Sequence, residues 1–344
     1  MQRTCFPSRA ARSAALLLLA AGQGLCATRP RYGGVLRVEV RESVETPDPP
    51  ETGVLAEPAR AFRIERWEPG RGAVWAANDD AAGGRPFLDG VEIHVARPVR
   101  DQALDLELGK ADLVEAGPNE ARRLRRTWSS APVRLVALVF DSRVTDGGVR
   151  AALALAIDRA AIHSVLLQRQ GEIAGSLLPQ WLSGYAFLFP AVQDLGRARG
   201  LAAPLAAAAR SLTLGYDPAE PLARPIAERI AVNARDAGLL IAVSPQTRNT
   251  DVRLAQVRID AAEPGTALAR VAAALGLGEP TPGAGPEALY AAERALLDGY
   301  RVIPLFHLPD VYGVGPRVHA WPAPGIGQLG EWRLENLWLE STQP

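Results

Sequence analysis

The segment 212–243 constrains the fold more than any other part of the chain. Its pattern predicts a strand at 212–216, an amphipathic helix centred on Ile230 that stops at Gly238, and a second strand at 239–243. A strand–helix–strand unit of this kind closes right-handed and leaves its two strands parallel. The segment therefore predicts a parallel part of a sheet with a helix packed on it.

The rest of the chain repeats this alternation of strands and helices. Strands are predicted by alternating or buried apolar patterns, and helices by apolar residues at spacings of three and four. The predicted elements are strands at 35–40, 91–95, 111–114, 135–140 and 301–306, a hairpin over 62–76 that turns at 69–72, and helices at 102–108 and around 289–297. This order argues for an α/β architecture.

The strongest helix signal follows Asp146. Asp146 can accept hydrogen bonds from the free N–H groups at a helix start, and Val149, Leu153 and Ile157 then lie on one face. We expect one continuous helix that runs to Gln170 and is stopped by the next residue, a glycine.

The first residues have the three-part layout of a secretory signal. Positive charges at Arg3, Arg9 and Arg12 precede an apolar run at 14–21, which is too short to span a membrane. Small residues then lead to a predicted cleavage after Ala27. We therefore expect a signal peptide at 1–27 and a periplasmic protein.

Both cysteines, Cys5 and Cys26, fall within this leader. Cleavage after Ala27 would leave a mature chain without disulfide or thiolate metal sites. Cys26 as a lipid anchor is the less favoured alternative, because residues 23–25 are a poor match to the small-residue box that precedes a lipidated cysteine.

The composition and motifs speak against several other classes of function. Lys plus Arg and Asp plus Glu each number 38, so there is no cationic surplus for nucleic acid. The four histidines have no second ligand at metal spacing, so no metal site or cofactor is expected. The GxGxxG match at 325–330 follows a Pro-rich loop, which argues against dinucleotide binding. A secreted hydrolase would need a nucleophile and base that the sequence does not show, so no catalytic residue is expected.

An ordered set of segments resembles the family 5 solute-binding proteins, which bind peptides, nickel chelates and related solutes for ABC importers. The segments are GGVLRV (33–38), FRIERWEPG (62–70), GRPFLD (84–89), GKADL (109–113), VFD (139–141) with VRAALALAIDR (149–159), LP (178–179) with GY (184–185), the unit 212–243, and VIPLFH (302–307) with PRV (316–318). Each segment alone is weak, but their shared order over most of the mature chain makes the match specific.

The resemblance implies a two-lobe, periplasmic-binding-protein-like (type II) α/β fold in a reduced form. The expected first lobe is 28–138, with 309–344 returning to it, and the second lobe is 139–308. Relatives are usually longer, with an accessory domain where this chain has only the Pro-rich stretch 45–58. The stretch 251–286 is also short and lacks the aromatic and acidic segment with which peptide-binding relatives hold a peptide's amino terminus.

The function that the resemblance implies is the periplasmic solute-binding component of an ABC importer. Two lobes would close over a small peptide or similar solute, and the partners would be permease subunits in the inner membrane, with no nucleic acid. A monomer is expected. The alternative is a degenerate homologue that carries no solute and serves as a scaffold or sensory partner, which the shortened second lobe motivates.

Five residues are candidate ligand contacts. The strands that cross between lobes are expected near 138–141 and 305–308, which would turn Phe140, Asp141 and His307 toward the cleft. Trp181 and Tyr185 could offer flat apolar surfaces to a peptide. Each has a structural alternative: core packing for Phe140, loop packing for Trp181 and Tyr185, turn capping for Asp141, and a structural or solvated role for His307.

Overall fold

The computed structural model describes residues 29–41, 61–280, 285–321 and 334–340. The predicted signal peptide, both cysteines, the Pro-rich stretch and the GxGxxG match lie outside these residues. No helix within these ranges is both long and apolar enough to cross a membrane.

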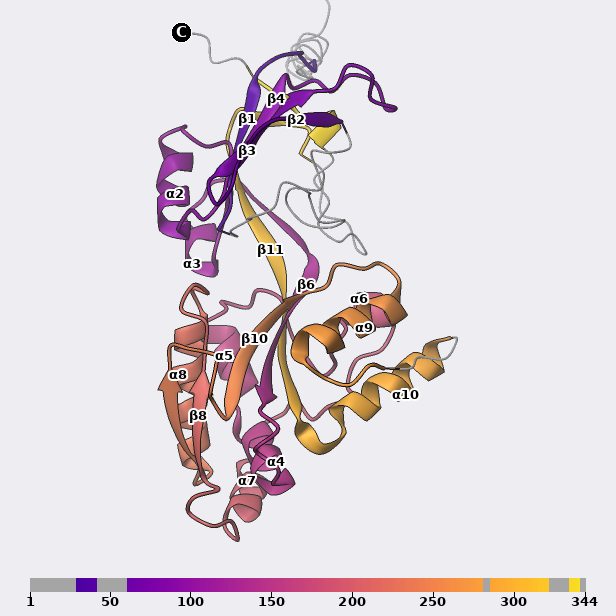
Figure 1. The fold of residues 1–344 in the computed structure, drawn as a ribbon. Helices are drawn as coiled ribbons and strands as arrows, with labels where there is room; N and C mark the ends of the chain where they lie inside the picture. Colours follow the sequence, from indigo (N-terminus) through magenta and orange to yellow (C-terminus); the bar gives the residue numbers. More distant parts are fainter. Residues whose placement is uncertain (1–28, 42–60, 281–284, 322–333, 341–344) are drawn as a thin grey trace, which may run out of the picture.

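One sheet runs through the whole molecule (Figure 1). Its strands follow the order β2-β3-β4-β1-β5-β11-β6-β10-β8-β9, and β7 pairs with β11 at the side. The strands are β1 (Val35–Glu39), β2 (Phe62–Glu68), β3 (Gly72–Ala77), β4 (Gly90–His94), β5 (Leu113–Glu115), β6 (Thr127–Phe140), β7 (Glu172–Ile173), β8 (Ser211–Gly215), β9 (Leu240–Ser244), β10 (Val252–Arg258) and β11 (Val302–Val314). A separate pair is formed by β12 (Val318–His319) and β13 (Trp338–Leu339).

The helices lie beside this sheet and divide between its two ends (Figure 1). At one end are α2 (Val99–Glu107) and α3 (Pro118–Ala121). At the other are α4 (Gly147–Ala156), α5 (Arg159–Val165), α6 (Gln180–Ser183), α7 (Leu195–Ala202), α8 (Ala223–Asp236), α9 (Pro264–Leu275) and α10 (Pro286–Leu297).

Two separate hydrophobic clusters define the two lobes. The first lobe surrounds a cluster built from β1, β3 and β4, together with Trp128 and Tyr312. The second lobe surrounds a larger cluster in which α4, α8 and α9 pack on β6, β8 and β11. Within the described residues, only the long strands β6 and β11 contribute side chains to both clusters. These two strands therefore connect the lobes.

The segment 212–243 folds as predicted. Strands β8 and β9 pair in parallel from Ser211 opposite Leu240 to Gly215 opposite Ser244, and α8 connects them. The left-handed φ of +85° at Gly238 ends the helix, as the sequence indicates. The hairpin over 62–76 is also confirmed, because β2 and β3 pair antiparallel.

The prediction of one helix from Asp146 to Gln170 is wrong. The chain leaves the helical conformation at Ile157, and Asp158 then starts α5 by accepting a hydrogen bond from the N–H of Ala161 at 2.8 Å. The backbone N–H of Asp158 donates instead to the Asn233 side chain on α8, at 3.2 Å. A contact with a distant helix thus stabilises a break that the apolar periodicity of the segment does not reveal.

The predicted cap of this helix is confirmed, since the Asp146 carboxylate accepts from the N–H groups of Gly148 at 2.7 Å and Val149 at 3.4 Å. Asp146→Ala leaves these donors without that acceptor. We expect the free energy of unfolding to fall by about 1 kcal/mol in urea titrations. Asp146→Asn, which keeps a capping oxygen, should lose clearly less, and equal losses would contradict the capping role.

Candidate functional site at the lobe crossing

The lobes cross where β6 and β11 pair between the two clusters. The pairing of β11 with β6 is irregular there, with register shifts between Leu308 and Pro309 and between Pro309 and Val311. Residues 135–140 already belong to the cluster of the second lobe. The strand β6 therefore crosses before Leu135, earlier than the predicted 138–141.

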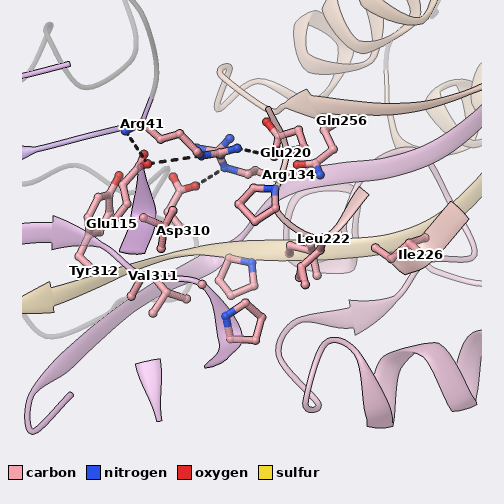
Figure 2. A pocket seen from close by; sticks show the side chains of 17 residues that line it. Arg41, Glu115, Arg134, Glu220, Leu222, Ile226, Gln256, Asp310, Val311 and Tyr312 are labelled. Atoms are coloured by element: carbon pink, nitrogen blue, oxygen red, sulfur yellow. Dashed lines mark hydrogen bonds and ion pairs between the residues drawn. The ribbon is translucent and has the colours of Figure 1, made fainter. Parts of the chain in front are cut away.

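A pocket lies at this crossing and receives side chains from both lobes (Figure 2). Arg41 and Glu115 come from the first lobe, and Glu220 and Leu222 come from the second. The crossing strands themselves contribute further lining residues, which are Arg134, Leu308, Pro309, Asp310, Val311 and Tyr312. The pocket is therefore placed where a movement between the lobes would change its shape.

Asp310 is the buried anion of this site. Its carboxylate pairs with Arg134 Nε and with Arg258 Nη1, each at 2.5 Å, while its side chain is only 3% exposed. Burial alone would raise the pKa of Asp310, but the two guanidinium groups outweigh this effect and hold the pKa below its usual value. The group is therefore charged at neutral pH.

Glu115 and Arg41 form a second charged pair in the pocket. The Glu115 carboxylate accepts a hydrogen bond from the backbone N–H of Arg41 at 2.8 Å, and burial raises its pKa. The Arg41 guanidinium reaches across to Glu220 of the second lobe at 2.6 Å (Figure 2). Arg41 thus joins the lobes through an ion pair.

A second polar link joins the lobes through Gln168. Its carbonyl oxygen accepts from Arg122 Nη1 at 3.2 Å, and its amide donates to Asn119. Both partners follow β5 in the first lobe, whereas Gln168 follows α5 in the second lobe. The lobes are therefore in contact through two polar links as well as through the crossing strands.

The five predicted contact residues do not line this pocket. Phe140 is 2% exposed at the end of β6, and the neighbouring Asp141 accepts from Arg143 N and Nε, both at 2.9 Å. This end of β6 pairs with Val302 at the start of β11, away from the crossing.

The other three lie in the second lobe around residues 177–179. Trp181 Nε1 donates to the carbonyl of Pro132 at 2.8 Å, and the Tyr185 hydroxyl donates to Glu293 at 2.7 Å. His307 is 1% exposed, with Nε2 3.1 Å from the carbonyl oxygen of Leu177. His307 is two residues from Pro309 in the crossing pocket but lines a different pocket. Ligand contact by these five residues stays a prediction.

The chemistry of the crossing pocket suits recognition by charge and hydrogen bonds. Two cations and three carboxylates line it: Arg41 and Arg134 with Glu115, Glu220 and Asp310. Arg258 pairs with Asp310 but does not line the pocket. Within the described ranges, no group of three or more His, Cys, Asp or Glu side chains could hold a metal ion. The arrangement can bind a polar solute through opposite charges at fixed positions.

Several solved structures share this fold. The ABC transporter substrate-binding protein CtaP from Listeria monocytogenes aligns with a TM-score of 0.68 at 16% identity, over 81% of this chain and 66% of that chain. The oligopeptide-binding protein AppA from Bacillus subtilis, in complex with a nonapeptide, gives 0.64 at 14% identity, over 82% and 66%. NikA from Staphylococcus aureus, in complex with Ni(L-His)2, gives 0.66 at 14% identity, over 81% and 68%.

These likenesses confirm the two-lobe, periplasmic-binding-protein-like α/β fold. The fold is reduced, because the chain spans only about two thirds of the length of each structure. No curated protein matches the sequence significantly. The sequence model described as "Bacterial extracellular solute-binding proteins, family 5 Middle" matches residues 60–274, which is more than half of the chain. The chain therefore belongs to the family 5 bacterial extracellular solute-binding proteins.

Proposed function

We propose that this protein is the solute-binding component of an ABC importer and holds a small peptide or similar solute between its lobes. Membership of family 5 supports this role. The observation that carries the proposal is the crossing pocket, where Arg41 and Glu115 of the first lobe meet Glu220 of the second lobe beside the two connecting strands. A solute bound there contacts both lobes at once.

Binding would work by closure of the lobes. The two connecting strands are irregular between Leu308 and Val311, so a rotation there would disturb few regular backbone hydrogen bonds. A solute that contacts both lobes binds the closed form better than the open form, and this difference in affinity shifts the population toward closure. The pocket is lined by cations and by carboxylates, which favours a solute that carries both signs, such as a short peptide.

The proposed partners follow from the same role. The exported, mature chain would act as a periplasmic monomer that delivers its solute to permease subunits in the inner membrane. No catalytic residue is needed for this task. The proposed lobe limits are the crossing of β6 before Leu135 and the crossing of β11 at 308–309.

A second candidate function is a scaffold or sensory partner that carries no solute. One observation favours it: the charged groups of the crossing pocket already pair with one another, and Arg41–Glu220 and Gln168 link the lobes. Small-angle scattering separates the two functions. A transport protein should become more compact when solute is added, whereas a scaffold should keep one radius of gyration.

The direct test is a thermal-shift screen of the mature chain against dipeptides, tripeptides and metal chelates. A true ligand at a hundredfold its Kd stabilises the native state by about 2.7 kcal/mol, which is a clear rise in Tm. Glu220→Gln should weaken the identified ligand at least about tenfold, because it removes one charge from the pocket. Glu228→Gln, in an exposed pair with Arg224, is the matched control. A screen without any stabilising compound would speak against solute binding.

A further inference from the structure

A second pocket lies within the second lobe, apart from the crossing pocket. It is lined by the start of α5, by β7, by the segment 186–193 and by His307, and it shares no lining residue with the crossing pocket. Its volume of about 440 Å³ falls in the range of small-molecule sites. The proposed function does not use this pocket.

A buried cation without a carboxylate partner contributes to the lining. Arg159 is 1% exposed; its Nε donates to the carbonyl of Pro304 at 3.1 Å and its Nη1 to that of Ala154 at 3.2 Å. Its Nη2 has no hydrogen-bond partner among the described residues. Burial is the cause that lowers the pKa of Arg159 to about 10, with no contribution from a nearby acid.

The two carboxylates that line the pocket have partners other than Arg159. Asp158 accepts from the N–H of Ala161 at 2.8 Å, and Glu172 lies 3.3 Å from His307 Nδ1. A buried charge without a counter-ion is costly. An anion in the pocket would therefore lower the free energy of this part of the lobe.

The rim of the pocket exposes apolar side chains. Phe187 is 90% exposed, Val192 82% and Ile173 37%. Phe187 has a left-handed φ of +57°, a strained conformation for an aromatic residue. Its backbone lies against Gly175, where an added Cβ would be 3.3 Å from Phe187 Cα. The fold thus exposes an aromatic ring to solvent at the mouth of the pocket. Because exposed apolar patches often mark binding sites, the rim can contact the apolar part of a ligand.

We propose that this pocket binds a carboxylate carried on an apolar group. The carboxylate would lie toward Arg159, and the apolar part would cover Phe187 and Val192. The ligand is either a small free acid or the C-terminus of a polypeptide, because both present the same chemistry.

Calorimetric titration of the mature chain with N-acetylphenylalanine and with its neutral amide tests the proposal. We expect the acid to bind at least about tenfold more tightly than the amide, because only the acid compensates the buried charge. Phe187→Gly should weaken the acid at least about fivefold without loss of stability, since glycine tolerates the positive φ. Val165→Ser, at an apolar residue that is 71% exposed and outside the pocket, is the control and should bind as the unchanged protein does.

Arg159→Met should abolish the difference between acid and amide. If this variant does not fold, the ratio of the acid and amide affinities of the unchanged protein and the affinity of Phe187→Gly for the acid still test the proposal. Equal affinity for acid and amide, no binding of either, or full binding by Phe187→Gly would overturn the proposal.

Two further titrations determine which pocket binds the acid and which kind of ligand the pocket prefers. Glu220→Gln, in the crossing pocket, should leave binding of the acid unchanged, and a loss would place the acid in the crossing pocket and overturn the proposal. This arm also separates the failure of this site from the failure of solute binding between the lobes. A tetrapeptide ending in phenylalanine that binds more tightly than the small acid would support a polypeptide C-terminus as the source, and weaker binding would support the free acid.

Discussion

Asp310→Asn is expected to lower the free energy of unfolding by about 3–5 kcal/mol, because it leaves buried charges without their counter-ion. In the pairing of β10 with β6, Arg258 lies directly opposite Arg134. Like charges in this position repel each other. The Asp310 carboxylate accepts hydrogen bonds from both guanidinium groups, and its negative charge offsets the repulsion between them.

The same variant should change how stability depends on pH. The folded-state pKa of Asp310 is held below its usual value, so its contribution is present above the unfolded-state pKa of about 3.9 and is lost as pH falls through the folded-state pKa. Urea unfolding between pH 7 and pH 3 should show a shallower fall for Asp310→Asn than for the unchanged protein. Glu228→Gln, in the exposed pair with Arg224, should alter stability little. A loss below about 1 kcal/mol at pH 7 would show that the ion pair does not stabilise the fold.

Local patterns were sufficient for much of the fold. The unit 212–243 was predictable because an apolar face at helical spacing and a terminal glycine act within a few residues of each other. The break at Ile157 was not predictable in this way. It depends on Asn233, which is 75 positions away from Asp158 in the sequence. The Asn233 side chain accepts a hydrogen bond from the backbone N–H of Asp158, where α5 begins.

The crossing pocket was harder to predict, since its charges come from distant parts of the chain. Arg134, Arg258 and Asp310 meet only because β10, β6 and β11 are neighbours in the sheet. One signal was present, because a charged residue inside an apolar strand is rarely buried without a partner. Asp310 stands in such a strand, but the prediction ended that strand at Phe306, whereas β11 continues to Val314.

The choice of site residues followed from the predicted position of the crossing. Placing it near 138–141 favoured Phe140 and Asp141, whereas the side chains of 135–140 pack in the core of the second lobe. The same shift explains why Arg134 was missed. The sequence pattern marks where an apolar strand is buried, but it does not show which of two cores buries it.

Gly171→Ala is expected to lower the free energy of unfolding by about 2–5 kcal/mol, for two additive reasons. Gly171 has a left-handed φ of +70°, which costs an alanine about 1–2 kcal/mol. An added Cβ would also lie 2.2 Å from the carbonyl oxygen of His307, a backbone atom of β11 that cannot rotate away. Overpacking of this kind costs about 1–3 kcal/mol more.

Gly184→Ala separates the two reasons. Gly184 has a similar φ of +79°, but an added Cβ would meet no atom within 4 Å, so only the conformational cost of about 1–2 kcal/mol should remain. Parallel urea titrations of both variants measure the difference. Glu172, the next residue, pairs with His307 beside the crossing. The displaced backbone in Gly171→Ala should therefore also weaken the binding of any solute between the lobes. Equal losses of stability in the two variants would contradict the overpacking argument. They would mean that the β11 backbone moves away from the added Cβ at little cost in free energy.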